Sequence, residues 1–177
     1  MDKWELYERY AREHGITAVI RFRTELLECE PRIRRLCTPE SCTSYGTNWI
    51  CPPACGDLPQ CASRLSRYSE GLFLEKKYLV NTKNITLTRK LAADYNKVLY
   101  DLLDYMRPGY PEALLLSTGG CSVCGRCTYP QKPCRRPSRR RGALSSYGID
   151  AAALCSRLGA EYSFTEGILY YIGLILV

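Results

Sequence analysis

The sequence predicts an α/β fold, in which helices pack on a mixed sheet of about four strands that is joined to two cysteine-rich loops. Three observations predict it. Stretches with apolar residues at helical spacing alternate with short apolar runs typical of strands. Nine of the eleven cysteines fall in two segments between these elements. The 177 residues are 46% hydrophobic, which suits one domain with a filled core, so we treat residues 1–177 as a single domain.

The chain opens with a helix followed by a strand. Residues 3–14 carry aromatic and small apolar side chains at helical spacing and stop before a glycine, which predicts a helix. Residues 18–23 alternate, which predicts a strand with Ala18, Ile20 and Phe22 facing the core and the other face mostly in water.

The middle of the chain follows the first cysteine-rich segment. We expect a helix over about 62–69 and a strand through 72–78. The longest helix should run from about 88 to 106 and end before Pro108. Its apolar stripe consists of Leu91, Tyr95, Val98, Leu99, Leu102, Leu103 and Met106.

The last third contains two strands and a helix. Residues 112–117 predict a short buried strand, and 168–177 a strongly apolar final strand. Between them, Asp150 is placed to cap a helix over 151–158 that Gly159 closes. Because both cysteine-rich segments connect sheet elements, we expect them at one end of the sheet, facing each other.

The second cysteine-rich segment, 119–142, is the more specific of the two. Cys121, Cys124 and Cys127 are separated by two residues each, and Cys134 follows next to a proline. This spacing resembles that of bacterial ferredoxins, whose thiolates hold an iron–sulfur cluster. Six residues separate Cys134 from Cys127 where ferredoxins have three, so Cys134 is also a candidate ligand of a second cluster. Zinc sites more often use two well-separated CxxC pairs.

The first cysteine-rich segment, 37–61, holds one thiol more than a single site needs. Its cysteines are Cys37, Cys42, Cys51, Cys55 and Cys61. We expect a second iron–sulfur cluster on Cys37, Cys42, Cys51 and one of Cys55 or Cys61, and the sequence leaves open which of the two. The nine candidate ligands therefore predict one or two [4Fe-4S] clusters, with zinc as the alternative. Cys29 and Cys155 lie outside both segments, and we interpret them as core residues.

Several classes of protein are disfavoured. The first residues contain no apolar signal region, and the longest apolar run, 167–177, is too short to cross a bilayer. We therefore expect a cytoplasmic protein with reduced thiols and no membrane association. His14 is the only histidine and suits the surface of the first helix. There is no phosphate loop, GxGxxG or HExxH string, so we identify no catalytic residue.

The positive charge is concentrated beside the last cysteine of the second segment. The net charge is +7, and the segment contains the basic residues Lys132, Arg135, Arg136, Arg139, Arg140 and Arg141. We expect the arginines to attract an acidic redox partner such as a ferredoxin or flavodoxin. Nucleic acid is a poorer fit, because such surfaces mix basic residues with exposed aromatic residues and only Tyr129 is close.

Four strings, three in the two segments and one shortly after the second, resemble DUF2284, a family of predicted metal-binding proteins of anaerobic bacteria and archaea. They are Cys-Pro-Pro-Ala-Cys-Gly at 51–56, Gly-Cys-Ser-Val-Cys-Gly-Arg-Cys-Thr-Tyr-Pro at 120–130, Pro-Cys-Arg-Arg-Pro at 133–137 and Ser-Tyr-Gly-Ile at 146–149. The resemblance covers nearly the whole chain and implies metal binding, without supplying a reaction. Relatives tend to have Ser-Met-Glu-Ala-Tyr-Gly at 143–148, where this chain lacks the glutamate.

The sequence thus predicts an iron–sulfur protein that transfers electrons or assists an anaerobic redox system. The alternative is a zinc-stabilised binding module, whose thiolates are structural and whose arginines contact an acidic partner.

Overall fold

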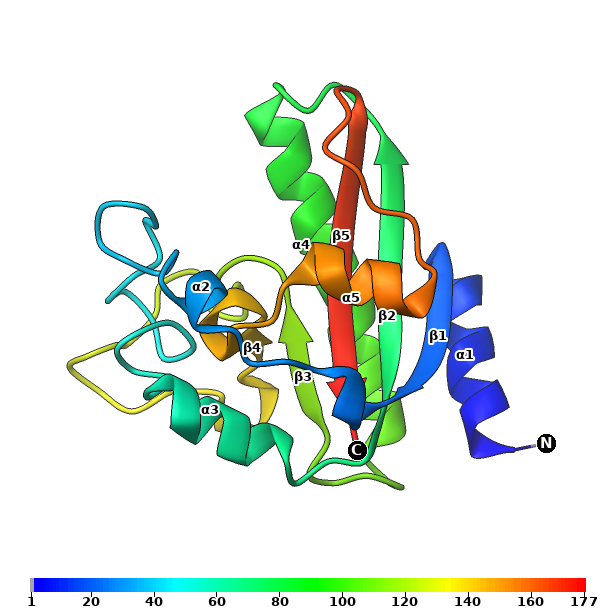
Figure 1. Ribbon diagram of the computed structural model, residues 1–177, viewed down its shortest axis with the longest axis horizontal. Helices are drawn as coiled ribbons and strands as arrows, with labels where there is room; N and C mark the ends of the chain where they lie inside the picture. The colour runs from blue at the N-terminus through cyan, green and yellow to red at the C-terminus, as the bar shows by residue number, and fades with distance from the viewer. Residues whose placement is uncertain (1) are drawn as a thin grey trace.

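A five-stranded mixed sheet forms the centre of the protein (Figure 1). The structure is a computed structural model that describes residues 2–177. The strands run in the order β1-β2-β5-β3-β4, and every neighbouring pair is antiparallel except β3 and β4. Their bounds are β1 Ala18–Arg23, β2 Glu70–Leu79, β3 Leu114–Ser117, β4 Gly142–Ala143 and β5 Ile168–Leu176. The predicted mixed α/β sheet is confirmed, with one more short strand than expected.

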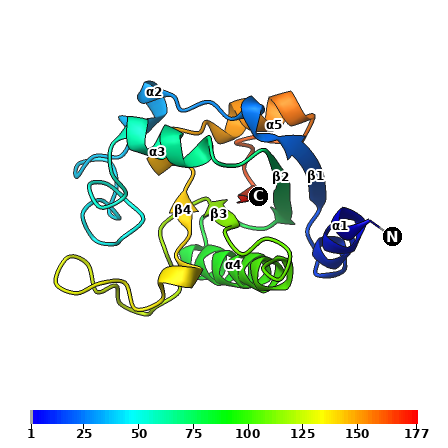
Figure 2. The ribbon, with the colours of Figure 1, turned by 90° about the horizontal axis from the view of Figure 1, so that it is seen from below.

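Helices cover both faces of the sheet (Figure 2). The helices α1 Lys3–Glu13 and α4 Ile85–Met106 pack on one face. The other face carries α3 Leu58–Leu65 and α5 Ala151–Leu158, next to the single-turn helix α2 Pro31–Arg34. Each face of the sheet has its own hydrophobic core. The strands contribute to both cores, because successive side chains of a strand point to opposite faces.

Strand β2 shows this alternation most clearly. Leu72 and Leu74 are fully buried in the core under α1 and α4, whereas Phe73 is fully buried in the core under α3 and α5. Strand β1 follows the same rule, and its second face is buried only at Val19, with Arg21 and Arg23 exposed, so the expectation that this face lies mostly in water is confirmed. Val19 packs toward α1 while Phe22 packs toward α3, because helices cover both sides of this edge strand.

Local capping fixes the helix ends. Asp150 accepts hydrogen bonds from the backbone N–H groups of Ala152 and Ala153, and Gly159 ends α5 in the left-handed region, as predicted. Helix α4 begins at Ile85, three residues earlier than expected, because Asn84 caps it.

Helix α3 also begins earlier than the sequence analysis placed it. The Asp57 carboxylate accepts from the backbone N–H of Gln60 at 2.8 Å, and the Gln60 side chain accepts from the backbone N–H of Asp57 at 2.9 Å. This reciprocal pair is a capping box. As a result Cys61 lies inside the helix rather than in the loop before it.

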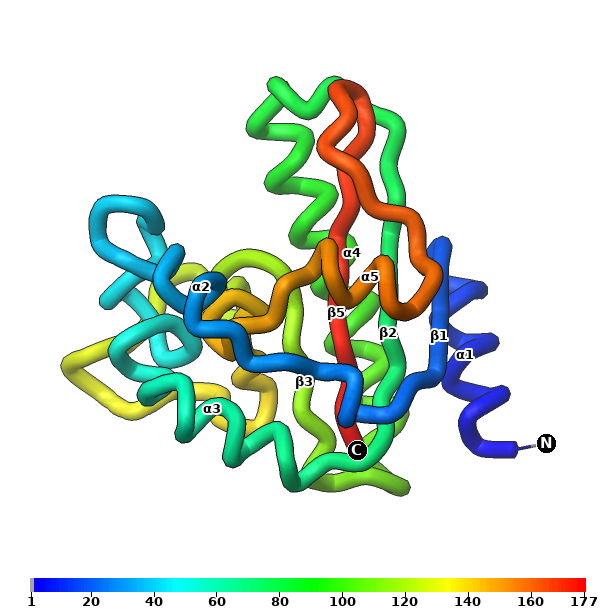
Figure 3. Tube along the Cα trace, viewed as in Figure 1, coloured from blue at the N-terminus to red at the C-terminus, as the bar shows by residue number. Residues whose placement is uncertain are grey.

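Three single 3₁₀ turns complete the structure: η1 Thr24–Leu26, η2 Pro137–Arg139 and η3 Ser145–Tyr147. Within residues 2–177, no helix has the length and apolar character needed to cross a membrane. The trace in Figure 3 shows the two cysteine-rich segments, one blue to cyan and the other yellow-green, beside each other at one side of the sheet.

Candidate metal centre

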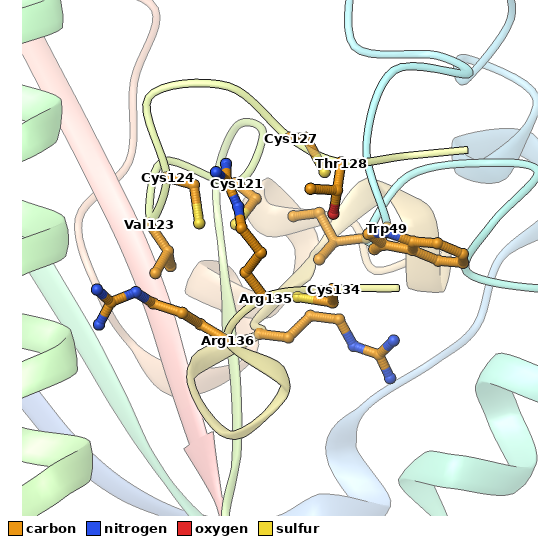
Figure 4. A pocket seen from close by; sticks show the side chains of 11 residues that line it. Trp49, Cys121, Val123, Cys124, Cys127, Thr128, Cys134, Arg135 and Arg136 are labelled. Carbon is orange, nitrogen blue, oxygen red and sulfur yellow. The ribbon is translucent and has the colours of Figure 1, made fainter. Parts of the chain in front are cut away.

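The second cysteine-rich segment surrounds a cavity. The segment connects β3 to β4, and its four thiols, from Cys121, Cys124, Cys127 and Cys134, all line one cavity of about 30 Å³ (Figure 4). We refer to it as the thiol cavity. The four cysteines that the sequence analysis grouped together therefore line the same cavity.

Hydrogen bonds within the loop hold the cysteines around the thiol cavity. The Thr128 hydroxyl donates to the carbonyl of Pro133 at 2.8 Å, and the backbone N–H of Lys132 donates to the carbonyl of Thr128 at 3.0 Å. The Arg135 side chain donates to the carbonyl of Arg126. These bonds fold the loop back on itself after Cys127. Cys134, which is more distant in the sequence, therefore lines the same cavity.

The thiols of this segment influence each other electrostatically. Burial raises the pKa of the Cys121 thiol, and the neighbouring Cys127 and Cys134 raise it further, while Arg141 opposes the shift. A metal reverses such a shift, because thiolates are the form that binds it.

The first cysteine-rich segment divides into two groups. In the first group, burial raises the pKa of the Cys51 thiol, with smaller contributions in the same direction from Cys42 and Cys37. A hydrogen bond from Asn48 opposes this shift. Cys37, Cys42 and Cys51 are therefore neighbours.

The second group is the pair Cys55 and Cys61, which lies between two arginines. Arg34 Nη1 donates to Cys55 Sγ at 3.3 Å, and Arg64 Nη2 donates to Cys61 Sγ at 3.1 Å. The hydrogen bond from Cys61, followed by Arg34, lowers the pKa of Cys55 to about 6, against the effect of burial. Cys61 is the proton donor of the pair, so its own pKa is raised.

Ser146 links the two groups of the first segment. It lies beside both Cys51 and Cys55 and lowers the pKa of each thiol. The turn η3 that carries Ser146 is fixed by Arg34, which donates to the carbonyls of Ser146 and Gly56. The sequence analysis overlooked Arg34 and Arg64. Arg64 could have been predicted from the sequence. If α3 is placed correctly from Leu58, Arg64 lies three residues after Cys61 on the same face of the helix.

The two cysteine-rich segments contact each other, as expected. The Trp49 and Tyr129 rings meet edge to face, with centroids 5.0 Å apart. Cys121 packs against the small cluster that Cys51 forms with Ile50 and Ala143.

The thiols do not converge on a point. Among residues 2–177, no three thiol, carboxylate or imidazole groups lie close enough to hold a single metal ion. The four thiols of the second segment stand instead on the walls of the thiol cavity.

The two remaining cysteines lie in the core under α3 and α5. Cys155 is buried on α5, and burial raises its pKa to about 12. Cys29 is half-buried against the same core. This agrees with their interpretation as packing residues.

The family of predicted metal-binding proteins known as DUF2284 matches residues 21–177. The chain belongs to this family. The match begins within β1 and includes both cysteine-rich segments and every later element. No curated protein and no solved structure matches the chain. Membership of DUF2284 identifies the protein as a predicted metal-binding protein, which its two cysteine-rich segments support.

The basic segment of this DUF2284 protein is less uniform than its sequence suggests. Arg141 is buried, with only 2% of its surface exposed, and so is not part of an exposed patch. Arg139 forms an ion pair with Asp104 on α4. Arg135, Arg136 and Arg140 remain exposed at the rim of the thiol cavity.

Proposed function

We propose that this DUF2284 protein binds iron–sulfur clusters and transfers electrons, or assists a larger redox system. The observation that carries the proposal is the thiol cavity, in which four cysteines from one short loop surround a common space. Four thiolates around one space can hold an iron–sulfur cluster or a single zinc ion. The two-residue spacing of Cys121, Cys124 and Cys127 is a ferredoxin-like arrangement.

The first segment is proposed to hold a second cluster through Cys37, Cys42, Cys51 and one further thiol. We favour Cys55 over Cys61 as that fourth ligand. Cys55 shares Ser146 with Cys51, and its lowered pKa favours the thiolate that binds metal. Cys61 instead lies inside α3 and is fully buried in the core under α3 and α5.

The surrounding side chains suit this role. A bound cluster supplies one-electron transfer. Trp49 and Tyr129 pack together beside the thiol cavity and limit the access of water. Arg34 donates to the Cys55 thiol, and hydrogen bonds and positive charge at ligand sulfurs stabilise the reduced, more negative state.

The test is anaerobic purification with iron, sulfide and zinc analysis of the wild type and two variants. We expect roughly four irons and four sulfides for each cluster in the wild type. Cys134→Ser should lose the iron of the second segment. Cys155→Ala is the matched control and should retain all of it, because Cys155 lies in the core under α5. Stoichiometric zinc without iron would refute the cluster and support the zinc-stabilised module.

We further propose that an acidic redox partner docks at the rim of the thiol cavity. Arg135, Arg136 and Arg140 are exposed there, so an acidic surface could approach the four thiols. Binding of a reduced ferredoxin should weaken with salt, and Arg136→Glu should slow electron transfer from it. Transfer rates that are independent of both salt and this substitution would argue against docking here.

A further inference from the structure

A second cavity lies between the two cysteine-rich segments and differs from the thiol cavity in its chemistry. Its volume is about 120 Å³, and the residues that matter to its chemistry are Trp49, Cys55, Arg64, Arg140, Arg141 and Tyr147. We call it the arginine cavity. Among residues 2–177, its lining includes three arginines and no carboxylate, so its charge is strongly positive.

Arg141 is the central observation. It is the largest fully buried side chain of the core, yet no carboxylate accompanies it. Its Nη2 donates to the carbonyls of Thr118, at 3.3 Å, and Gly120. Its Nε and Nη1 are buried and have no hydrogen-bond partner within residues 2–177. A buried charged group with free donors is costly, so such donors generally have an acceptor.

Two further donors around the arginine cavity are also unsatisfied in the described part of the chain. The Nε of Arg64 is buried without a partner, although its Nη2 donates to the Cys61 thiol and to the carbonyl of Cys55. The indole N–H of Trp49 is likewise buried without a partner. Three side chains that line the arginine cavity, from separate parts of the chain, therefore each carry a buried N–H group without an acceptor among residues 2–177.

From these donors we infer that the arginine cavity binds a small oxyanion, a phosphate or carboxylate group of a small molecule. Guanidinium groups match both in charge and geometry. The volume of about 120 Å³ is well above the roughly 15 Å³ that one water needs, so an oxyanion fits. Arg140 is exposed and lines the same cavity, which gives the anion a route from solvent. The arginine cavity adjoins the proposed metal ligands, since Cys55 lines it and Arg141 lies near Cys121.

The site can be tested by titrating inorganic phosphate, and separately acetate, into the anaerobically purified protein at constant ionic strength. Isothermal titration calorimetry should show saturable binding of one anion per chain. Tighter binding of phosphate would assign the site to a phosphate group, and tighter binding of acetate to a carboxylate. Arg140→Gln should weaken binding roughly tenfold, the typical effect of losing one charge-assisted hydrogen bond. Arg141→Lys should weaken it at least as much, because lysine retains the charge but not the free Nε and Nη1 donors.

Arg136→Gln is the matched control, because Arg136 is exposed and lines the thiol cavity but not the arginine cavity. It should leave the affinity unchanged. Equal weakening by Arg136→Gln would indicate unspecific attraction and overturn the inference, as would the absence of saturable binding. Metal analysis of the same samples tests the proposed function separately. If only metal-free protein binds the anion, a cluster occupies these donors and the inference is wrong.

Discussion

Glu75 is a carboxyl group buried in the sheet, with 3% of its surface exposed. It lies in β2, and its Oε2 has no hydrogen-bond partner within residues 2–177. Burial, assisted by the nearby Glu161, raises its pKa from 4.5 to about 7, although Lys77 opposes the shift. The folded protein therefore holds the Glu75 proton more tightly than the unfolded chain does.

Stability should consequently fall as the pH rises from about 4.5 to about 7, and stay level above that range, because only the unfolded chain is fully ionised in between. Glu75→Gln removes this ionisation. We expect it to raise the free energy of unfolding at pH 8 relative to wild type, by up to roughly 3 kcal/mol, and by much less at pH 5. Urea unfolding at the two pH values measures the difference.

Glu161→Gln is the matched control, because Glu161 neighbours Glu75 but is exposed. Its stability should show the same fall with pH as wild type, moved slightly to lower pH, because the Glu161 charge helps to raise the pKa of Glu75. If Glu75→Gln and wild type differ by the same amount at pH 5 and pH 8, Glu75 is not the titrating group.

At the scale of the elements, β4 attaches the second cysteine-rich segment to the sheet. Its two residues pair in parallel with Leu116 and Ser117 of β3. Gly142 makes this approach possible. A Cβ atom there would collide with Leu116 and lie 2.7 Å from the ring of Tyr147, in the turn η3.

Gly142→Ala should therefore separate β4 from β3 and destabilise the protein by about 1–3 kcal/mol, the usual cost of overpacking. It should also reduce the metal content, because β4 follows directly on the thiol loop. Gly125→Ala is the control, since a Cβ at Gly125 meets no atom within 4 Å. Thermal unfolding and metal analysis of both variants provide the measurement. Equal behaviour of the two variants would show that β4 does not hold the segment in place.

The sequence predicts elements whose signals are local. Helix α5 is delimited by Asp150 and Gly159, residues that act within one turn of the chain, and its bounds were predicted correctly. The start of α3 was equally local, in the capping box of Asp57 and Gln60, but the cysteine-rich context obscured it. Strand β4 carries no such signal, because two residues pair in parallel only after distant segments have met.

The candidate site is also predictable only where its residues are close in the sequence. The two-residue spacing of Cys121, Cys124 and Cys127 indicates that these thiols share one loop, whereas only the fold shows that Cys134 lines the same cavity. No local pattern indicates that Arg34 reaches Cys55, since the two residues are 21 positions apart and only the tertiary fold joins them. Arg141 looked like a member of a charged run, and its burial depends on packing against the carbonyls of Thr118 and Gly120.

At the scale of the whole molecule, the protein has two parts that are held together differently. The sheet and its helices have an apolar core on each face, formed from regular elements. The two cysteine-rich segments consist mainly of turns, and they meet at a small apolar cluster of Ile50, Cys51 and Ala143 with Cys121 against it. We therefore expect the order of these segments to depend on bound metal, while the sheet and helices do not need it.

Limited proteolysis can test this division, because each cysteine-rich segment offers cleavage sites for a different protease. Segment 37–61 contains no lysine or arginine but has Tyr45 and Trp49, so chymotrypsin reports on it. Segment 119–142 offers Arg126 and Arg135 to trypsin. After metal removal, both proteases should cut these sites much faster, whereas far-ultraviolet circular dichroism should change little. Lys97 in α4 is the internal control and should stay protected. Rapid cleavage at Lys97 with loss of the dichroism signal would show that the metal holds the entire fold together.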